Sequence, residues 1–214
     1  MQNSKNVIIA DDFQYKNDFF NKLEFSFKKG KKILDVGCGP ATDAQIFIKR
    51  YGLRFYGTDV YEDKNIRKQK LHFKRGSILS IPFKNNNFDY VFVHDVLHHI
   101  DEPKHRKEKH VLALKELYRV CKKNGYIVII EGNRYNPLFY PHMVKIRKHE
   151  HLRQSYFKSI IKRTFKNDTI VFKFFEAHFY PQPLLLFFKV YEFLMEHISP
   201  KQFLAYNAAI IKKA

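Results

Sequence analysis

The stretch that decides the fold is Ile33-Leu34-Asp35-Val36-Gly37-Cys38-Gly39-Pro40. Its apolar first half predicts a short buried strand, which runs directly into a Gly-X-Gly turn and then a helix. Because Gly37 and Gly39 lack a Cβ atom, a ligand can lie against the backbone of this turn. The stretch therefore predicts a loop that binds a nucleoside or a dinucleotide.

Two acidic residues and the absence of a third glycine restrict the class of ligand that this loop is expected to bind. The third glycine of the dinucleotide motif would fall at position 42, which is Thr42, and that glycine accompanies a pyrophosphate. Asp35, directly before the loop, suits a cationic group instead. Asp59 ends the next expected strand, where a carboxylate accepts the hydroxyls of a ribose. A nucleoside with a positively charged amino acid tail, S-adenosylmethionine, fits this pair, and a nicotinamide oxidoreductase is disfavoured.

Strand and helix patterns alternate along the chain, which is typical of a doubly wound α/β sheet. We expect strands at residues 32–36, 53–59, 71–76, 89–94, 126–131, 169–175 and 204–211, and helices at residues 12–27, 40–51, 110–121 and 152–166. The helix at 40–51 is expected to begin with Pro40 in its first turn, and Asn124-Gly125 to stop the helix at 110–121.

The division expected from these patterns is a single domain covering residues 1–214. Within it we expect an N-terminal helical cap (1–30), a cofactor-binding core (31–131), a lid with a basic helical insertion after the fifth strand (132–168), and C-terminal strands with a helix (169–214). The apolar segment 184–198 has two interpretations. It either packs as a helix on the sheet or contacts lipid, with Lys158, Lys162 and Lys166 meeting anionic headgroups.

Composition limits the partners. The 214 residues carry a formal net charge of +18, which favours nucleic acid, an anionic membrane or an acidic substrate, although a Lys-rich composition alone also explains it. Two cysteines cannot form a disulfide framework, so a reducing compartment, the cytoplasm, is expected, with peripheral membrane contact as an option. No segment is long and apolar enough to span a bilayer. The oligomeric state stays open.

Five blocks of this sequence, in order, resemble the class I S-adenosylmethionine-dependent methyltransferases, and the type 11-like group most. They are residues 33–40, 57–59, 81–83, 88–100 and 114–131. The resemblance covers roughly residues 30–131. It implies a seven-stranded, mostly parallel sheet in the order 3-2-1-4-5-7-6 with an antiparallel last strand, and S-adenosyl-L-methionine as cofactor.

The resemblance also implies positions for the cofactor. Asp35, Gly37, Cys38 and Gly39 would line its methionine half, and Asp59 would hold the ribose. Serine at position 77 departs from the acid that many members carry, which weakens the expected adenine contact. The remaining implied contacts are Val60, Ser77 and Ile78 at the adenine, and His94 and Asp95 at the ammonium.

Catalytic candidates follow from the chemistry of methyl transfer, an in-line displacement that needs a base only when the acceptor is protonated. The candidates at or near the expected carboxyl edge are His98, Glu131 and His142, with His99 beside them; Glu131 has the alternative of pairing with Arg134. No metal site is expected from His94, Asp95, His98 and His99, because His94 belongs to a strand. The histidines at positions 72, 105, 110, 149 and 151 are expected to be solvated.

The acceptor side is expected to come from the helix at 12–27, the loop at 134–142 and the helix at 152–166. Tyr15 would cover the cofactor, and Tyr135, Phe139, Tyr140 and His142 would line the acceptor cavity. The sequence predicts methyl transfer to a small-molecule or lipid-like acceptor. An RNA methyltransferase and a non-catalytic S-adenosylmethionine-binding module remain the alternatives.

Overall fold

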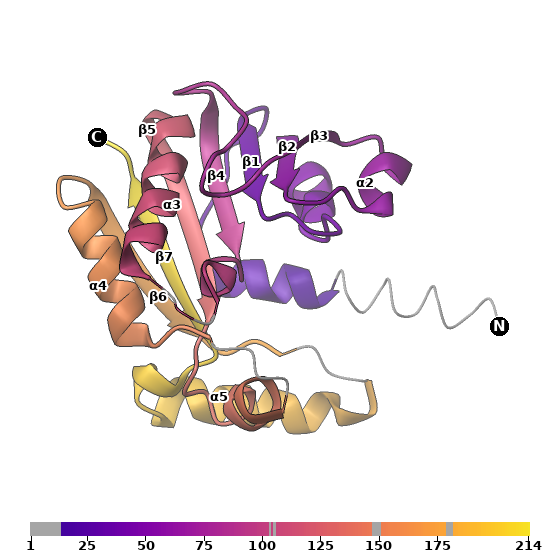
Figure 1. Ribbon diagram of the computed structural model, residues 1–214. Helices are drawn as coiled ribbons and strands as arrows, with labels where there is room; N and C mark the ends of the chain where they lie inside the picture. The colour runs from indigo at the N-terminus through magenta and orange to yellow at the C-terminus, as the bar shows by residue number, and fades with distance from the viewer. Residues whose placement is uncertain (1–13, 103, 105, 147–150, 179–181) are drawn as a thin grey trace.

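Seven strands form a single sheet in the computed structural model, which describes residues 14–102, 104, 106–146, 151–178 and 182–214 (Figure 1). The strand order is β3-β2-β1-β4-β5-β7-β6, and β7 runs antiparallel to both of its neighbours. The predicted fold class and strand order are confirmed. The strands are β1 (Lys32–Val36), β2 (Arg54–Asp59), β3 (His72–Arg75), β4 (Phe88–His94), β5 (Cys121–Gly132), β6 (Thr169–Phe175) and β7 (Tyr206–Lys212).

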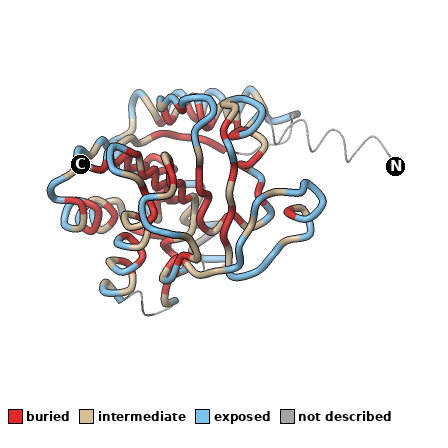
Figure 2. Tube along the Cα trace, turned by 90° about the horizontal axis from the view of Figure 1, so that it is seen from above, coloured by how far each residue is buried: buried red, intermediate tan, exposed pale blue. Residues whose placement is uncertain are grey.

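Helices cover both faces of the sheet because its central strands are apolar on both sides. In β4, Tyr90 and Phe92 point into one core, and Val91 and Val93 point into the other. Figure 2 shows these central strands buried beneath exposed loops. One core includes the helix at residues 14–23 and the π-helix η1 (Ile46–Arg50), and the other includes α3 (Lys107–Val120) and α4 (Gln154–Thr164).

Shorter elements complete the described chain. They are α2 (Lys64–Lys68), η2 (Leu97–His99), η3 (Tyr140–Ile146), η4 (Gln182–Leu184) and η5 (Lys201–Phe203). The remaining long helix is α5 (Leu185–Ile198). In the part of the chain that the structure describes, no helix is long and apolar enough to cross a membrane.

Three helix predictions were wrong at their ends. The helix at 40–51 does not begin at Pro40, because the turn continues through Ala41 at a φ of 54° and the helical residues start at 44. The N-terminal helix ends at residue 23, where Glu24 takes a φ of 50°. Asn124-Gly125 does not stop α3, which ends at Val120; the pair lies inside β5, near the shift in its register with β4.

Helix α5 lies across the end of the sheet at which β4 terminates (Figure 1). Its inward side carries Glu192 and Met195, which are both buried. The carboxylates of Glu192 and Glu196 pair with Lys22 Nζ at 2.9 and 3.0 Å, and Glu192 also accepts the backbone N–H of His178 at 3.1 Å. The helix thus packs against the protein through these acids and the buried side chain of Met195, while the lipid interpretation of segment 184–198 stays a prediction. Its exposed apolar residues are Leu186, Phe187, Val190, Phe193, Leu194 and Ile198.

Candidate functional site

The glycine turn after β1 is built so that no side chain fills it. Gly37 has a φ of 74°, and a Cβ atom on it would lie 2.4 Å from Val96 Cγ2, so only glycine fits this position. The backbone N–H groups of Gly37 and Cys38 both donate to the carbonyl of Thr58, at 2.7 and 3.2 Å. These bonds tie the turn to the end of β2 and leave its outer side open to a ligand.

A cavity of about 520 Å³ opens beside this turn, at the carboxyl ends of β1, β2 and β4. Ligands of open α/β sheets bind at this edge. Seven of the ten expected cofactor residues line it, namely Gly37, Gly39, Asp59, Val60, Ser77, Ile78 and Asp95.

Asp59 fixes the geometry of the cavity floor. Its Oδ2 accepts the backbone N–H of Gly39 at 2.8 Å, and its Oδ1 accepts that of Tyr61 at 3.4 Å. One carboxylate oxygen thus bonds the glycine turn and the other the loop after β2, and Asp59 lines the cavity. This position is the one from which an acid holds a ribose in nucleoside-binding sheets.

The other three expected cofactor residues, Asp35, Cys38 and His94, lie behind the cavity wall. Asp35 is only 3% exposed, and burial together with the nearby carboxylate of Asp43 raises the pKa of Asp35 well above its ordinary value. Burial also raises the pKa of the Cys38 thiol, which makes it a poor nucleophile.

A buried ionic group stands next to Asp35. Lys16 Nζ pairs with Asp43 Oδ1 at 2.8 Å, and His94 Nδ1 lies 3.0 Å from Asp43 Oδ2. Although burial favours its neutral form, Lys16 and His94 hold the pKa of Asp43 below its usual range. The side chain of His94 therefore stacks on Phe19 of the N-terminal helix, and its Nε2 lies 3.6 Å from Asp95 Oδ2.

Glu131 and His98 form a buried pair. Glu131 Oε2 accepts His98 Nδ1–H at 2.8 Å, while Oε1 accepts the backbone N–H groups of Val96 and Leu97 at 3.0 and 2.6 Å. Burial lowers the pKa of His98, but the hydrogen bond to Glu131 and the charges of Glu131 and Asp95 outweigh it and raise this pKa. The partners of Glu131 are therefore in the loop after β4, and the expected pairing with Arg134 is not among its contacts.

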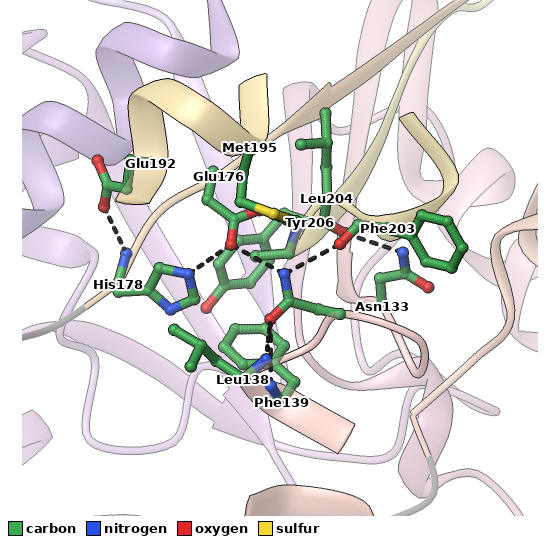
Figure 3. Close-up of polar contacts among 12 residues, drawn as sticks. Asn133, Leu138, Phe139, Glu176, His178, Glu192, Met195, Phe203, Leu204 and Tyr206 are labelled. Carbon is green, nitrogen blue, oxygen red and sulfur yellow. Dashed lines mark hydrogen bonds and ion pairs between the residues drawn. The ribbon is translucent and has the colours of Figure 1, made fainter. Parts of the chain in front are cut away.

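The loop after β5, expected to form part of the acceptor side, is organised by Glu176 (Figure 3). Glu176 Oε1 accepts from Asn136 Nδ2 at 2.8 Å and from His178 Nε2 at 2.6 Å, and Oε2 accepts the backbone N–H of Ala205 at 2.8 Å. Asn136 in turn accepts the N–H of Phe139 at 3.1 Å. Neither Asn136 nor Glu176 was singled out from the sequence, because their contacts join segments 40 residues apart.

The residues expected to line an acceptor cavity are spread out. Tyr15 Oη lies 3.4 Å from Tyr206 Oη, where burial raises the pKa of Tyr15 to about 12. Phe139 packs against Tyr206, with ring centroids 5.5 Å apart, and Tyr135 is exposed. His142 lies in η3, and its side chain is outside what the structure describes.

Several residues that line the cavity were not expected from the sequence. Tyr61 and Val96 are next to residues that were expected to line the cavity. The other residues reach the cavity because of the conformation of the turn and of the η2 loop. The residues missed as cofactor contacts are Tyr61, Gly76, Leu79, Val96, His99, Ile100 and Asp101.

Two histidines expected to be solvated are buried. His110 Nε2 donates to the carbonyl of Leu97 at 3.0 Å, and its Nδ1 accepts Tyr156 Oη–H at 2.6 Å, so it joins α3, α4 and η2. His151 is 6% exposed and packs beside His98. His72 is exposed as expected, and the expectations for residues 105 and 149 lie outside the described residues.

Part of the chain matches a known protein family. The model of the type 11 methyltransferase domain matches residues 34–129. Residues 34–129 are thereby identified as a type 11 methyltransferase domain. The resemblance drawn from the five sequence blocks is thereby confirmed, and every residue that lines the 520 Å³ cavity falls inside the methyltransferase domain.

Individual proteins agree with this assignment. An uncharacterized methyltransferase of Schizosaccharomyces pombe is 34% identical over 144 residues, covering 60% of this chain and 48% of that protein. A demethylmenaquinone methyltransferase of Geobacillus sp. (strain WCH70) is 34% identical over 118 residues, covering 50% and 47%. The chain spans about half the length of these curated relatives.

A solved structure extends the likeness beyond the methyltransferase domain. The crystal structure of an S-adenosylmethionine-dependent methyltransferase from Archaeoglobus fulgidus superposes with a TM-score of 0.67 over 94% of both chains, at 20% sequence identity. At this identity the likeness shows the fold alone, and it includes β6, β7 and α5, which lie beyond the domain model.

Proposed function

We propose that this chain transfers a methyl group from S-adenosyl-L-methionine to a small-molecule or lipid-like acceptor. One observation carries the proposal. The turn without side chains at Gly37 and Gly39, the carboxylate of Asp59 and a cavity of about 520 Å³ meet at one edge of the sheet, inside the methyltransferase domain.

The residues present fit this cofactor. Gly37, Gly39 and Asp59 all line the cavity, so a ligand can lie against the backbone of the turn, and Asp59 stands where a ribose is held. When bound, the cofactor supplies a methyl group on a positively charged sulfur. Asp35, whose pKa is raised by burial and by Asp43, gains a cationic neighbour when an ammonium group approaches from the cavity side.

This chain's task in the reaction is mainly positioning. The leaving group of methyl transfer is neutral, so no residue is required to stabilise an anion, and alignment with exclusion of water supplies most of the acceleration. His98, Glu131 and His142 stay predictions as catalytic residues. The contacts of Glu131 with Val96, Leu97 and His98 favour a role in holding the loop beside the cavity.

The acceptor class follows from the orientation of α5. Its acids face the protein and pair with Lys22, while six of its apolar side chains are exposed. Phe187 is 63% exposed and Leu186 is 78% exposed, and six apolar side chains of this kind on one helix exceed the scattered exposure of an ordinary surface.

We infer that a lipid surface covers this side of α5. A chain with a net charge of +18 is attracted to anionic headgroups, and an apolar stripe adds insertion into the interface. A lipid-like acceptor dissolved in that surface would reach the same end of the sheet, at which both α5 and the cavity lie (Figure 1). The demethylmenaquinone methyltransferases among the relatives, whose name denotes a quinone acceptor, support this choice.

A transfer assay tests the proposal. The chain is incubated with cofactor labelled in its methyl group and with three kinds of acceptor: hydroxylated quinones in vesicles, small polar amines, and RNA. We expect label to appear in a vesicle-soluble acceptor. Label in RNA alone would replace the proposed acceptor class, and no label with tight cofactor binding would favour a non-catalytic binding module.

A further inference from the structure

Three side chains from separate segments meet behind the methyltransferase cavity. Asp95 follows β4, His98 lies in η2, and His151 lies between η3 and α4. Each offers one ligand atom, and these three atoms lie within 4.8 Å of one another. We propose that Asp95, His98 and His151 form a binding site for a divalent transition-metal ion such as Zn²⁺.

His98 is oriented as a metal-bound imidazole is. Its Nδ1–H donates to Glu131 Oε2 at 2.8 Å, and this bond leaves Nε2 with its lone pair directed away from the carboxylate. Metal-ligating histidines almost always donate their other N–H to a carboxylate, carbonyl or water in this way. Glu131 is 0% exposed and is itself held by two backbone N–H groups, so the imidazole is rigidly placed.

Asp95 is also held with one oxygen toward the site. Its backbone takes a φ of 55°, uncommon outside glycine, and its N–H donates to the carbonyl of Ile130 at 2.9 Å. Oδ1 accepts the N–H of Gly132 at 2.7 Å. This geometry turns the carboxylate back over the end of β5, toward the two imidazoles.

Gly132 makes room for the third ligand. A Cβ atom at this position would lie 2.6 Å from His151 Nδ1, so the ring approaches β5 only because residue 132 is glycine. The backbone next to His151 is fixed by the bond from Arg134 N to the carbonyl of Leu152, at 3.2 Å. The rings of His98 and His151 lie 4.5 Å apart, centroid to centroid.

The donor set is that of an open metal site. Two imidazoles and one carboxylate suit Zn²⁺ or Fe²⁺, and three protein ligands leave positions for water or another oxygen ligand. Ligand atoms around a tetrahedral zinc lie about 3.3 Å apart, given bonds of about 2.0 Å, so binding draws the three side chains closer together.

The location gives the ion access to ligands from two sides. Asp95 lines the 520 Å³ cavity, and His151 lines a second cavity of about 570 Å³, formed with Arg134 and the start of α4. An ion between them would take an oxygen-bearing ligand in its open position. The sequence alone does not indicate this set of three ligands. His94 is close to Asp95 and His98 in the sequence, but its side chain contacts Asp43, whereas His151 is distant from them in the sequence.

Metal binding by the untagged, metal-depleted full chain tests the site. Co²⁺ is titrated while its visible ligand-field absorption is recorded, and Zn²⁺ is measured by competition and by metal content after gel filtration. We expect one ion per chain. The variants His151→Ala and Asp95→Asn are expected to lose at least tenfold in affinity, whereas His72→Ala, which removes an exposed histidine, retains it.

Two outcomes overturn the site: no stoichiometric ion on the parent chain, or equal affinity in His151→Ala and His72→Ala, which would mean adventitious binding only. Circular dichroism of each variant shows whether it is folded, and the milder His151→Asn serves if His151→Ala is not. S-adenosylmethionine affinity is measured separately on the same samples. The site and the proposed methyl transfer can therefore fail independently.

Discussion

Asp59 and Gly39, 20 residues apart, are joined by a hydrogen bond of 2.8 Å from the backbone N–H of the glycine to Oδ2 of the acid. This bond places a carboxylate at the rim of a turn in which Gly37 and Gly39 carry no side chain. The same carboxylate is the one expected to hold the ribose of the cofactor. One residue therefore shapes the loop and is also the proposed ligand for the ribose.

Asp59→Ala is expected to weaken S-adenosylmethionine binding by roughly 1–3 kcal/mol, the cost of losing hydrogen bonds to a charged group. Isothermal titration calorimetry measures the change. Asp63→Ala is the matched control, because Asp63 caps α2 through the N–H of Asn65 and does not line the cavity. Equal affinity in the two variants would remove Asp59 from the ribose site.

Asp35→Asn is expected to stabilise the free chain while weakening cofactor binding. Burial and Asp43 raise the pKa of Asp35 in the folded state, so folding disfavours its ionised form and stability falls as the pH rises toward that pKa. The gain in Tm should thus be larger at about pH 8 than at about pH 5. Thermal unfolding at both pH values gives the first readout.

Calorimetry gives the second readout for Asp35→Asn, because the amide cannot neutralise the ammonium group of the cofactor. In the parent chain, binding should strengthen as the pH rises and should release protons to the buffer. A variant that gains stability but binds the cofactor as well as the parent chain would place Asp35 outside the cofactor site.

Glu131→Ala is expected to cost about 3–5 kcal/mol of unfolding free energy, because it leaves buried partners unsatisfied. Those partners are His98 and the backbone N–H groups of Val96 and Leu97. Urea denaturation measures the loss. Glu102→Ala, which removes a carboxylate 3.5 Å from exposed His99, should cost under about 1 kcal/mol. Similar costs in both variants would contradict the holding role of Glu131.

A variant with Leu186→Gln, Phe187→Gln and Phe193→Gln is expected to lose binding to anionic vesicles and to keep its Tm, because these side chains are exposed on α5. Flotation with vesicles of phosphatidylglycerol and phosphatidylcholine measures recovery. Leu112→Gln, an exposed apolar position on α3, is the control and should float as the parent chain does.

Undiminished flotation of that triple variant would leave α5 without a role at the membrane. Recovery of the parent chain with vesicles of phosphatidylcholine alone separates the electrostatic from the apolar contribution to membrane binding. If it equals the recovery with anionic vesicles, binding has no electrostatic contribution and depends on the apolar side chains.

The features predicted correctly from the sequence are those that depend on short segments of the chain. The strands at 32–36 and 169–175 have the expected bounds, and β2 and β4 end at Asp59 and His94 as expected, because apolar runs and turn residues mark their limits locally. The order of the sheet was available only through the family resemblance. Seven of the ten residues predicted to contact the cofactor line the cavity, because motif residues follow strand ends.

What failed depends on contacts between distant segments. The start of the helix at 40–51 was wrong because the turn conformation at Ala41 depends on the glycine loop before it. His151 was expected to be solvated, yet Gly132 lets it pack under the loop after β4. The outward apolar side of α5 depends on Lys22, more than 160 residues earlier, which draws Glu192 inward.

The central claim is that the cavity beside Gly37 and Gly39 binds S-adenosylmethionine. Isothermal titration calorimetry of the full chain with S-adenosylmethionine, S-adenosylhomocysteine and NAD tests it most directly. We expect one site per chain that binds both adenosyl compounds and prefers them to NAD. Tighter binding of NAD, or no binding of either adenosyl compound, would contradict it.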